Sequence, residues 1–241
     1  MAQHIGIVAC SIPGAALCYE TIGIEGAKLM GEWAHPEITL HNIPLSEYTP
    51  LFQRGDWPGV AELMLRSAEI LGRAGADFLI CPDNTIHQAL PFLLPRSPRP
   101  WLHIAEEVAR EAQRQGFYRV GLTGTKFLME GPVYPPKFAE AGIELRLPSP
   151  KARAAINRII FEELVYGKFL TESLACFQQV IECFKDQGCQ AVALSCTEIP
   201  LLVTPEVSPL PTLDSTRLLA KASVDVACGD AALPVWRGGP I

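Results

Sequence analysis

The chain has 241 residues, of which 49% are apolar and 19% charged, enough to fill the core of one large or two small domains. Its formal net charge of −6, with no run of basic residues, argues against a nucleic-acid or anionic-membrane partner. No stretch reaches the roughly 18 apolar residues that a membrane span needs, and the N-terminus lacks the basic region of a signal peptide. We therefore expect a cytoplasmic protein that binds a small molecule.

Eight cysteines are scattered along the chain, mostly inside apolar patterns. In a cytosolic protein of this size they are expected to be reduced thiols and not disulfides. Cys176 and Cys183 lie seven residues apart in a helical pattern, without a histidine at ligand spacing. We therefore expect no metal site.

Buried apolar runs alternate with amphipathic segments along the chain. The predicted strands are 4–10, 37–43, 76–81, 119–124, 142–148, 189–196 and 210–214. The predicted helices are 59–75, 102–116, 151–166, 171–187 and 214–228, the last with Asp214 as its N-cap. The Pro-rich segment 90–101 is predicted to be a surface loop, and 236–241 a frayed tail. This alternation predicts an α/β fold with mainly parallel sheets flanked by helices.

The sequence contains an internal repeat. Residues 74–85 match 187–198 at an offset of 113: in each stretch a helix-capping glycine is followed by an apolar run and then by a polar cluster. Residues 5–11 match 120–126 at an offset of 115. Two similar offsets in the same order indicate two related α/β halves.

The polar clusters begin at Asp83 in one half and at Cys196 in the other, at the carboxyl ends of equivalent strands. Ligands bind at these ends in open parallel sheets. A pseudo-twofold arrangement would place the two residues opposite each other across one cleft. Asn84, Thr85 and Thr197 follow them, where backbone N–H groups and side-chain donors can hold a carboxylate. Residues of this kind also serve simply as caps and turn residues.

Four stretches carry a resemblance to a known family: "NTIH" (84–87), "GLTGTKFLMEGPVYPPKFAEAGIEL" (121–145), "INRIIFEELVYGKF" (156–169) and "SCTEIPLLV" (195–203). Together they resemble the cofactor-independent aspartate/glutamate racemases, most closely the aspartate racemase branch, over nearly the whole chain. The resemblance implies two α/β domains related by a pseudo-dyad, an active site in the cleft between them, homodimers, and no pyridoxal phosphate or other cofactor. The expected domains are 1–116 with 214–241, and 117–213.

In this family two acid/base residues, usually cysteines, flank the α-carbon of the substrate. One removes the α-proton while the other returns a proton to the opposite face. Cys196 falls on the second of these positions, and the helix expected after it would lower the pKa of the thiol through its dipole. The resemblance places Ser11, Asn84 and Thr85 around the carboxylate and amino groups of the substrate, and Thr197 and Glu198 follow Cys196 as the family pattern expects. Thr125 is a further expected substrate-binding residue. Lys168 is a candidate partner for a charged end of the substrate, although lysines of this kind are usually solvated on the surface.

The first acid/base position departs from the family pattern, because Asp83 stands where a cysteine or a threonine is usual. Cys81, two residues earlier, could share a face with it but is expected to pack in the core. An ordinary aspartate pKa of about 3.9 makes a weak base towards an α-proton. Asp83 is therefore expected either to donate a proton, oriented by His87, or only to bind the substrate's ammonium group.

Other functions stay open beside an amino-acid racemase or epimerase. The family also resembles decarboxylases with a single catalytic cysteine and cis–trans isomerases of small dicarboxylic acids. A non-catalytic carboxylate-binding protein is a further alternative. The segment 41–52 lacks the arginine that some aspartate-specific relatives carry there, so the side chain of the substrate stays unassigned. We expect a racemase-like isomerase that acts at the α-carbon of a small carboxylate.

Overall fold

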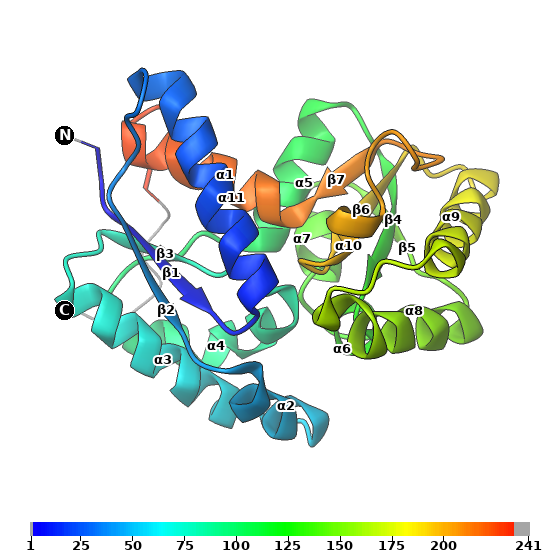
Figure 1. Cartoon of the computed structure of the whole chain (residues 1–241), viewed down its shortest axis with the longest axis horizontal. Coiled ribbons are helices and arrows are strands. Elements are labelled where there is room, and N and C mark those ends of the chain that lie inside the picture. The colour runs from blue at the N-terminus through cyan, green and yellow to red at the C-terminus, as the bar shows by residue number, and fades with distance from the viewer. Residues whose placement is uncertain (1, 234–241) are drawn as a thin grey trace. The chain divides into compact units, whose positions relative to one another are not determined.

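The computed structural model describes residues 2–233 and divides the chain into two compact units (Figure 1). The first unit comprises 1–104 with 219–241, and the second comprises 105–218. Each has a wholly parallel sheet flanked by helices, so the predicted fold class is confirmed. The expected tail 236–241 lies outside the described residues. None of the described helices has the length and apolar character to cross a membrane.

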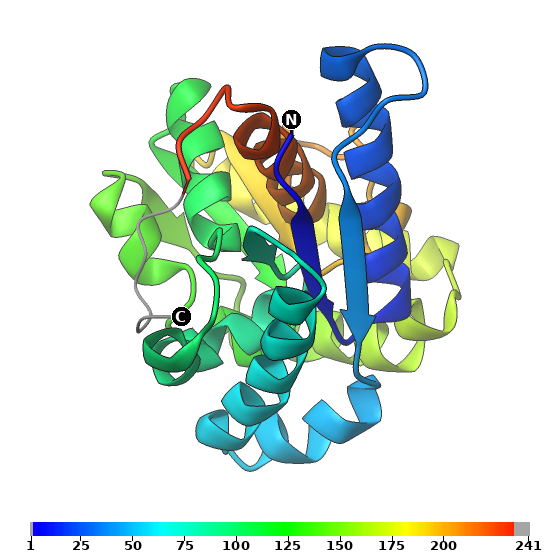
Figure 2. The same cartoon turned by 90° about the vertical axis from the view of Figure 1, so that its left-hand side faces the viewer.

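The first unit has a three-stranded sheet with the order β2-β1-β3. The strands are β1 (Ile5–Ala9), β2 (Ile38–Asn42) and β3 (Phe78–Ile80). The helices are α1 (Ile12–Met30), α2 (Leu45–Gln53), α3 (Trp57–Arg73) and α4 (Leu90–Leu93), with 3₁₀ turns at Asn84–Ala89 and Leu94–Arg96. Apolar side chains of β1 and β3 pack against α1 and α11 (Ser215–Cys228) in one core. Figure 2 shows α3 on the opposite face of this sheet.

The second unit has a four-stranded sheet with the order β5-β4-β6-β7. The strands are β4 (Arg119–Gly124), β5 (Glu144–Arg146), β6 (Ala191–Ser195) and β7 (Thr212–Asp214). The helices are α5 (Ile104–Arg114), α6 (Lys126–Met129), α7 (Pro135–Glu140), α8 (Pro150–Glu162), α9 (Thr171–Asp186) and α10 (Ile199–Leu202), with a 3₁₀ turn at Leu164–Tyr166. Figure 1 shows α5 and α7 on one side of this sheet and α8 and α9 on the other.

The repeat inferred from the sequence is present in the strand order and the register. The central strand of each unit pairs with the strand that precedes its polar cluster: Ile5 pairs with Phe78 in the first unit, and Val120 pairs with Ala191 in the second. These pairs reproduce the sequence offsets of 115 and 113. The β2-β1-β3 arrangement thus corresponds to β5-β4-β6, with β7 added at one edge.

A glycine occupies the second position of each central pairing, and in both units close packing requires it. A Cβ atom on Gly6 would lie 2.5 Å from Leu79 Cδ2, and one on Gly121 would lie 2.4 Å from Phe184 Cδ2. Both neighbours are buried, so neither side chain has room to move away. The two glycines therefore serve the same purpose in the two halves.

The unit boundaries lie at 104/105 and 218/219, whereas the sequence suggested 116/117 and 213/214. Helix α5 belongs to the second unit because Ala105, Val108 and Ala112 pack into its core. The start of α11 belongs there too, because the Ser215 hydroxyl donates to the carbonyl of Leu194 at 3.0 Å. Asp214 is the predicted cap of α11. Its Oδ1 accepts hydrogen bonds from the backbone N–H groups of Thr216 at 3.0 Å and Arg217 at 3.1 Å.

The prediction of a surface loop at 90–101 is wrong. Leu90–Leu93 forms a helical turn that continues into a 3₁₀ turn, and the side chains of Leu90 and Leu93 are buried. Trp101 is also buried and forms a parallel bridge with Leu79 of β3. Proline near the start of each short helix is compatible with that geometry, because the first helical N–H groups have no partner inside the helix.

Candidate functional site

Asp83 lies just beyond β3, at the carboxyl edge of the first sheet. Its side chain is 8% exposed, and its Oδ2 accepts a hydrogen bond from the backbone N–H of Cys10 at 2.8 Å. The N–H of Ser11 approaches the same oxygen at 3.5 Å. Because β1 and β3 are parallel neighbours, both of their carboxyl ends meet at this point. The structure therefore brings Asp83 and Ser11 together.

Two effects act on the carboxyl group of Asp83 in opposite directions. Burial disfavours the charged form, whereas a hydrogen bond from a backbone N–H favours it. The two effects therefore oppose each other at this carboxyl group.

Asn84 and Thr85 open the 3₁₀ turn Asn84–Ala89 directly after Asp83. Asn84 is buried, and its Nδ2 lies 3.5 Å from the carbonyl of Pro82, while Thr85 is half-buried. Ser11 is the N-cap of α1, where its Oγ accepts from the N–H of Gly14 at 3.5 Å. Asn84, Thr85 and Ser11 thus lie at the same sheet edge, and Ser11 also has a structural role as a cap.

Cys81 is fully buried, and its Sγ lies 3.7 Å from the carbonyl oxygen of Asp83. Burial, together with the negative charge of Asp83, raises the pKa of the Cys81 thiol well above its usual value. A thiol of this kind is a poor source of thiolate. These observations agree with a core-packing role for Cys81.

His87 contacts two residues of the same unit. Its Nε2 lies 2.9 Å from the carbonyl oxygen of Cys81, so this nitrogen carries the proton and donates it. Its ring packs edge-on against the ring of His103, with a centroid distance of 4.9 Å. His87 therefore connects the turn after β3 to Cys81, the residue that directly follows the strand.

Cys196 lies just beyond β6 in the second unit and is half-buried. Its Sγ lies 3.0 Å from Oε2 of Glu198, which also accepts a hydrogen bond from the Thr197 hydroxyl at 2.7 Å. Thr197 and Glu198 are both buried. One buried carboxylate thus holds the thiol and the hydroxyl, and it is placed to accept the thiol proton.

The helix expected to activate Cys196 is short. Helix α10 contains only the four residues Ile199–Leu202, with Glu198 at its N-cap position. A single turn carries few aligned peptide dipoles, so the predicted activation by a helix dipole is not supported. The carboxylate of Glu198, which sequence reasoning assigned to substrate binding, is the acidic group that contacts the thiol.

Thr125 lies at the same sheet edge as Cys196. Gly124 pairs with Ser195, so the residues that follow them, Thr125 and Cys196, leave two neighbouring strands side by side. Thr125 is buried and caps α6, with its Oγ1 accepting from the N–H of Leu128 at 3.1 Å. By contrast, Lys168 is exposed, and its Nζ lies 5.9 Å from the ring centroid of Tyr166.

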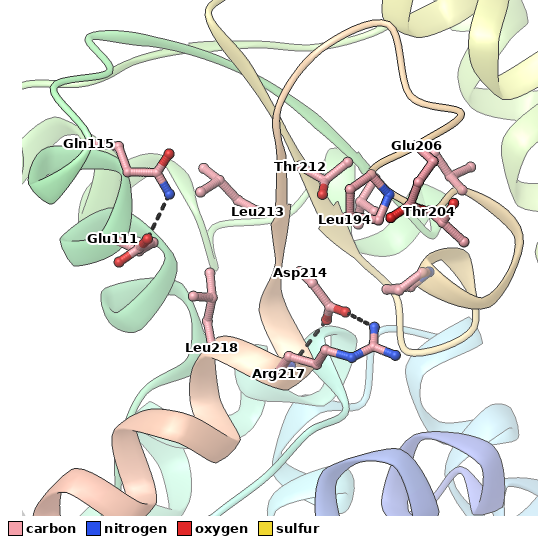
Figure 3. A pocket seen from close by; sticks show the side chains of 13 residues that line it. Glu111, Gln115, Leu194, Thr204, Glu206, Thr212, Leu213, Asp214, Arg217 and Leu218 are labelled. Atoms are coloured by element: carbon pink, nitrogen blue, oxygen red, sulfur yellow. Dashed lines mark hydrogen bonds and ion pairs between the residues drawn. The ribbon is translucent and has the colours of Figure 1, made fainter. Parts of the chain in front are cut away.

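A cavity of about 460 Å³ lies in the second unit (Figure 3). Asp214 and Arg217 form an ion pair in its lining, and the Gln115 amide donates to Glu111 at 2.6 Å. None of the residues predicted for the site lines this cavity. It is therefore separate from the side chains of Cys196 and Thr197.

The described residues contain no group of three or more His, Cys, Asp or Glu side chains able to hold a metal ion. All eight cysteines lie among the described residues, and none of them forms a disulfide. Sequence reasoning missed two residues of the first unit. They are Cys10, whose backbone anchors the carboxyl group, and Tyr48, a fully buried residue of α2. Recognition of α2 as a helix would have drawn attention to Tyr48.

Each comparison with known proteins leads to the same family. The sequence profile of the family described as Asp/Glu/hydantoin racemase matches residues 25–223. The broad specificity amino-acid racemase RacX of Bacillus subtilis (strain 168) is 23% identical over 192 residues, which cover 79% of this chain and 81% of that protein.

Solved structures agree with this result. A candidate Asp/Glu racemase from Yersinia pestis has a TM-score of 0.84 and 30% identity, covering 94% of this chain and 99% of that one. An aspartate racemase homologue from Pyrococcus horikoshii OT3 has a TM-score of 0.78 and 27% identity, covering 95% and 100%. The chain belongs to the Asp/Glu/hydantoin racemase family, as its sequence motifs predict.

Proposed function

We propose that the protein is a cofactor-independent amino-acid racemase in which Cys196 and Asp83 act on the α-carbon of one substrate. The observation that carries this proposal is the equivalence of the two residues in the repeat. Phe78 and Ala191 are equivalent residues, because each pairs with the central strand of its unit at the corresponding position. Asp83 lies five residues beyond Phe78, and Cys196 lies five residues beyond Ala191. Membership of a racemase family supports the same assignment.

The reaction uses the two residues in opposite roles. The Cys196 thiolate removes the α-proton of one enantiomer, and the electron pair of the broken C–H bond delocalises into the substrate carboxylate. The protonated carboxyl group of Asp83 then donates its proton to the opposite face of the carbon. The enzyme is left with a Cys196 thiol and an ionised Asp83, which is the form that accepts the other enantiomer.

The surroundings of both groups suit this exchange of roles. Glu198 accepts the hydrogen bond of the Cys196 thiol and can hold its proton before the substrate binds. The Cys10 N–H stabilises the ionised form of Asp83, whereas burial stabilises the neutral form. We assign the substrate carboxylate and ammonium groups to Ser11, Asn84, Thr85, Thr125 and Thr197, with Lys168 as the candidate for a charged end of the substrate.

A second candidate is a decarboxylase in which one cysteine protonates a planar enediolate. The specific observation in its favour is that Asp83 replaces the first thiol, while Cys81 is buried and its pKa is raised. In that case Cys196 is the one reacting group. Release of CO₂ from a disubstituted malonate would identify this activity.

The direct test of the proposed racemase is α-proton exchange in D₂O. Each enantiomer of a panel of amino acids is incubated with the enzyme, and loss of the Cα–H signal is followed by proton NMR. We expect exchange and formation of the opposite enantiomer with at least one amino acid, and their loss in Cys196→Ser. Cys183→Ser, which changes an exposed cysteine, is the matched control. The absence of exchange with every amino acid would refute the proposal.

The family resemblance also implies a homodimer, and we further propose that the protein works in the cytoplasm. Both stay predictions for this chain. Sedimentation equilibrium measures the assembly directly, with a mass of twice 26.3 kDa expected for a homodimer. A mass of one chain at micromolar concentration would contradict the expected dimer.

A further inference from the structure

Tyr48 is a buried tyrosine whose hydroxyl has no hydrogen-bond partner among the described residues. Tyr134 offers a direct comparison, because it is equally buried but has the hydroxyl of Ser215 as a partner. Buried tyrosine hydroxyls usually find a partner, since an unpaired one costs free energy. The lone hydroxyl of Tyr48 therefore needs an explanation that packing alone does not supply.

The position of Tyr48 in the fold places it at the edge of the sheet that carries Asp83. It lies in α2, which follows β2, and β2 is the parallel neighbour of β1. The N–H of Ile43, between β2 and α2, donates to the carbonyl of Ala9 at 3.1 Å. The chain therefore enters α2 directly beside the carboxyl end of β1, where Cys10 anchors Asp83.

Electrostatic effects agree with this placement. The pKa of Tyr48 is raised first by burial and then, to a smaller extent, by electrostatic interaction with the ionisable groups of Cys10, Cys81 and Asp83. These residues form the polar cluster at the ends of β1 and β3. A raised pKa keeps Tyr48 neutral at physiological pH, so its hydroxyl remains a hydrogen-bond donor.

The charges around Tyr48 limit what can bind there. Arg66 is the cation that affects Tyr48, but its side chain is 54% exposed and its Nη2 lies 3.6 Å from Oε2 of Glu47. A second carboxylate brought next to Tyr48 would meet the carboxyl group of Asp83 and a neutral phenol. A neutral acceptor would meet the phenol without that repulsion.

We propose that the Tyr48 hydroxyl binds a neutral hydrogen-bond acceptor on the substrate side chain, so that uncharged polar amino acids are preferred to aspartate and glutamate. This inference rests on the proposed racemase function and names its substrate class. Tyr48 is then a specificity-determining residue in the same site as Asp83.

The test uses three substrates of nearly the same shape: asparagine, aspartate and leucine. Asparagine carries a neutral acceptor, aspartate a charged one, and leucine none. Rates of α-proton exchange in D₂O give kcat/KM for each, and calorimetry gives the affinity of each for Cys196→Ser. We expect the wild-type enzyme to prefer asparagine to the other two by at least about tenfold, the value of one neutral hydrogen bond. Preference for aspartate would overturn the inference.

Tyr48→Phe removes the hydroxyl and keeps the ring. We expect kcat/KM for asparagine to fall about tenfold, chiefly through KM, while the value for leucine stays within about twofold. Because no hydrogen bond within the described residues is lost, the melting temperature should not fall. Tyr134→Phe is the matched control, and it should lower the melting temperature without changing the ratio of asparagine to leucine.

Each failure has its own signature. If the wild-type enzyme exchanges α-protons but Tyr48→Phe changes all substrates equally or none, Tyr48 does not determine specificity, and the racemase proposal stands. A second outcome is that the wild-type enzyme exchanges no α-protons, but adding Tyr48→Phe to the Cys196→Ser variant selectively weakens its binding of asparagine. The racemase proposal then fails, and the binding role of Tyr48 stands. If Tyr48→Phe keeps both the exchange rates and the binding selectivity of the wild-type enzyme, the inference is overturned.

Discussion

Oδ2 of Asp83 lies 2.8 Å from the backbone nitrogen of Cys10, so the end of β1 fixes the carboxyl group that follows β3. A side chain held by backbone is oriented independently of other side chains. This contact explains how an aspartate can occupy a position where relatives usually carry a cysteine.

Substitution of Asp83 tests its acid/base role. Asp83→Asn keeps an oxygen that can accept from the Cys10 N–H but cannot exchange a proton. We expect racemisation to fall by at least about 100-fold, as for loss of a general acid or base, with little change in the melting temperature. Asp83→Cys should restore or raise activity in both directions, measured by circular dichroism of the product. If Asp83→Asn keeps the wild-type kcat and only its KM rises, Asp83 is a binding residue and not an acid or base.

Alkylation tests the assignment of Cys196. We expect iodoacetamide to modify Cys196 faster than Cys183, although Cys183 is more exposed, because the Cys196 thiol donates to Glu198, which is placed to act as its general base. Substrate should protect Cys196 but not Cys183. Cys81 should stay unmodified in the folded protein, because it is buried and its pKa is raised. Peptide mass spectrometry reports each site, and rapid labelling of Cys81 with Cys196 inert would reverse the assignment.

Glu198 should matter for turnover more than for substrate affinity. Glu198→Gln keeps a hydrogen-bond acceptor for Thr197 but removes the charge that can take up the thiol proton. We expect kcat to fall roughly 10- to 100-fold, with KM changed less. Initial rates over a range of substrate concentrations separate the two constants. Equal activity of Glu198→Gln and the wild-type enzyme would show that another group accepts the proton.

The paired glycines give a test of the duplicated fold. Gly6→Ala and Gly121→Ala each place a methyl group within 2.5 Å of a buried side-chain carbon. We expect each to lower the free energy of unfolding by roughly 1–3 kcal/mol, because the core is overpacked. Gly23→Ala is the control, since a Cβ there meets nothing within 4 Å, and it should stabilise α1 by up to about 1 kcal/mol. Urea denaturation distinguishes these results.

The regular parts of the fold could be predicted from the sequence. β4 spans the predicted residues 119–124, and the repeat located the equivalent strands because buried parallel strands are continuous apolar runs. Helices α1 and α2 were not predicted. Three glycines interrupt the apolar stripe of α1, and Pro50 lies inside the short α2. Their stability comes from packing against the sheet, which local propensity does not reveal.

The candidate site could be predicted in part. Asp83 and Cys196 follow buried strands, so their location at a sheet edge could be inferred from chain order. The N–H of Cys10 and the hydroxyl of Tyr48 could not, because a backbone donor leaves no signature in the sequence and Tyr48 reads as an ordinary apolar residue. The contact between Cys196 and Glu198 depends on the turn after β6, whose geometry local sequence rules do not specify.

The central claim is that Asp83 and Cys196 serve opposite faces of one substrate. The most direct measurement compares α-proton exchange of the separate D- and L-enantiomers in D₂O for the wild-type enzyme, Asp83→Ala and Cys196→Ser. We expect the wild-type enzyme to exchange both enantiomers, Asp83→Ala to exchange only the one deprotonated by Cys196, and neither variant to interconvert them. Interconversion by Asp83→Ala at the wild-type rate would contradict the claim.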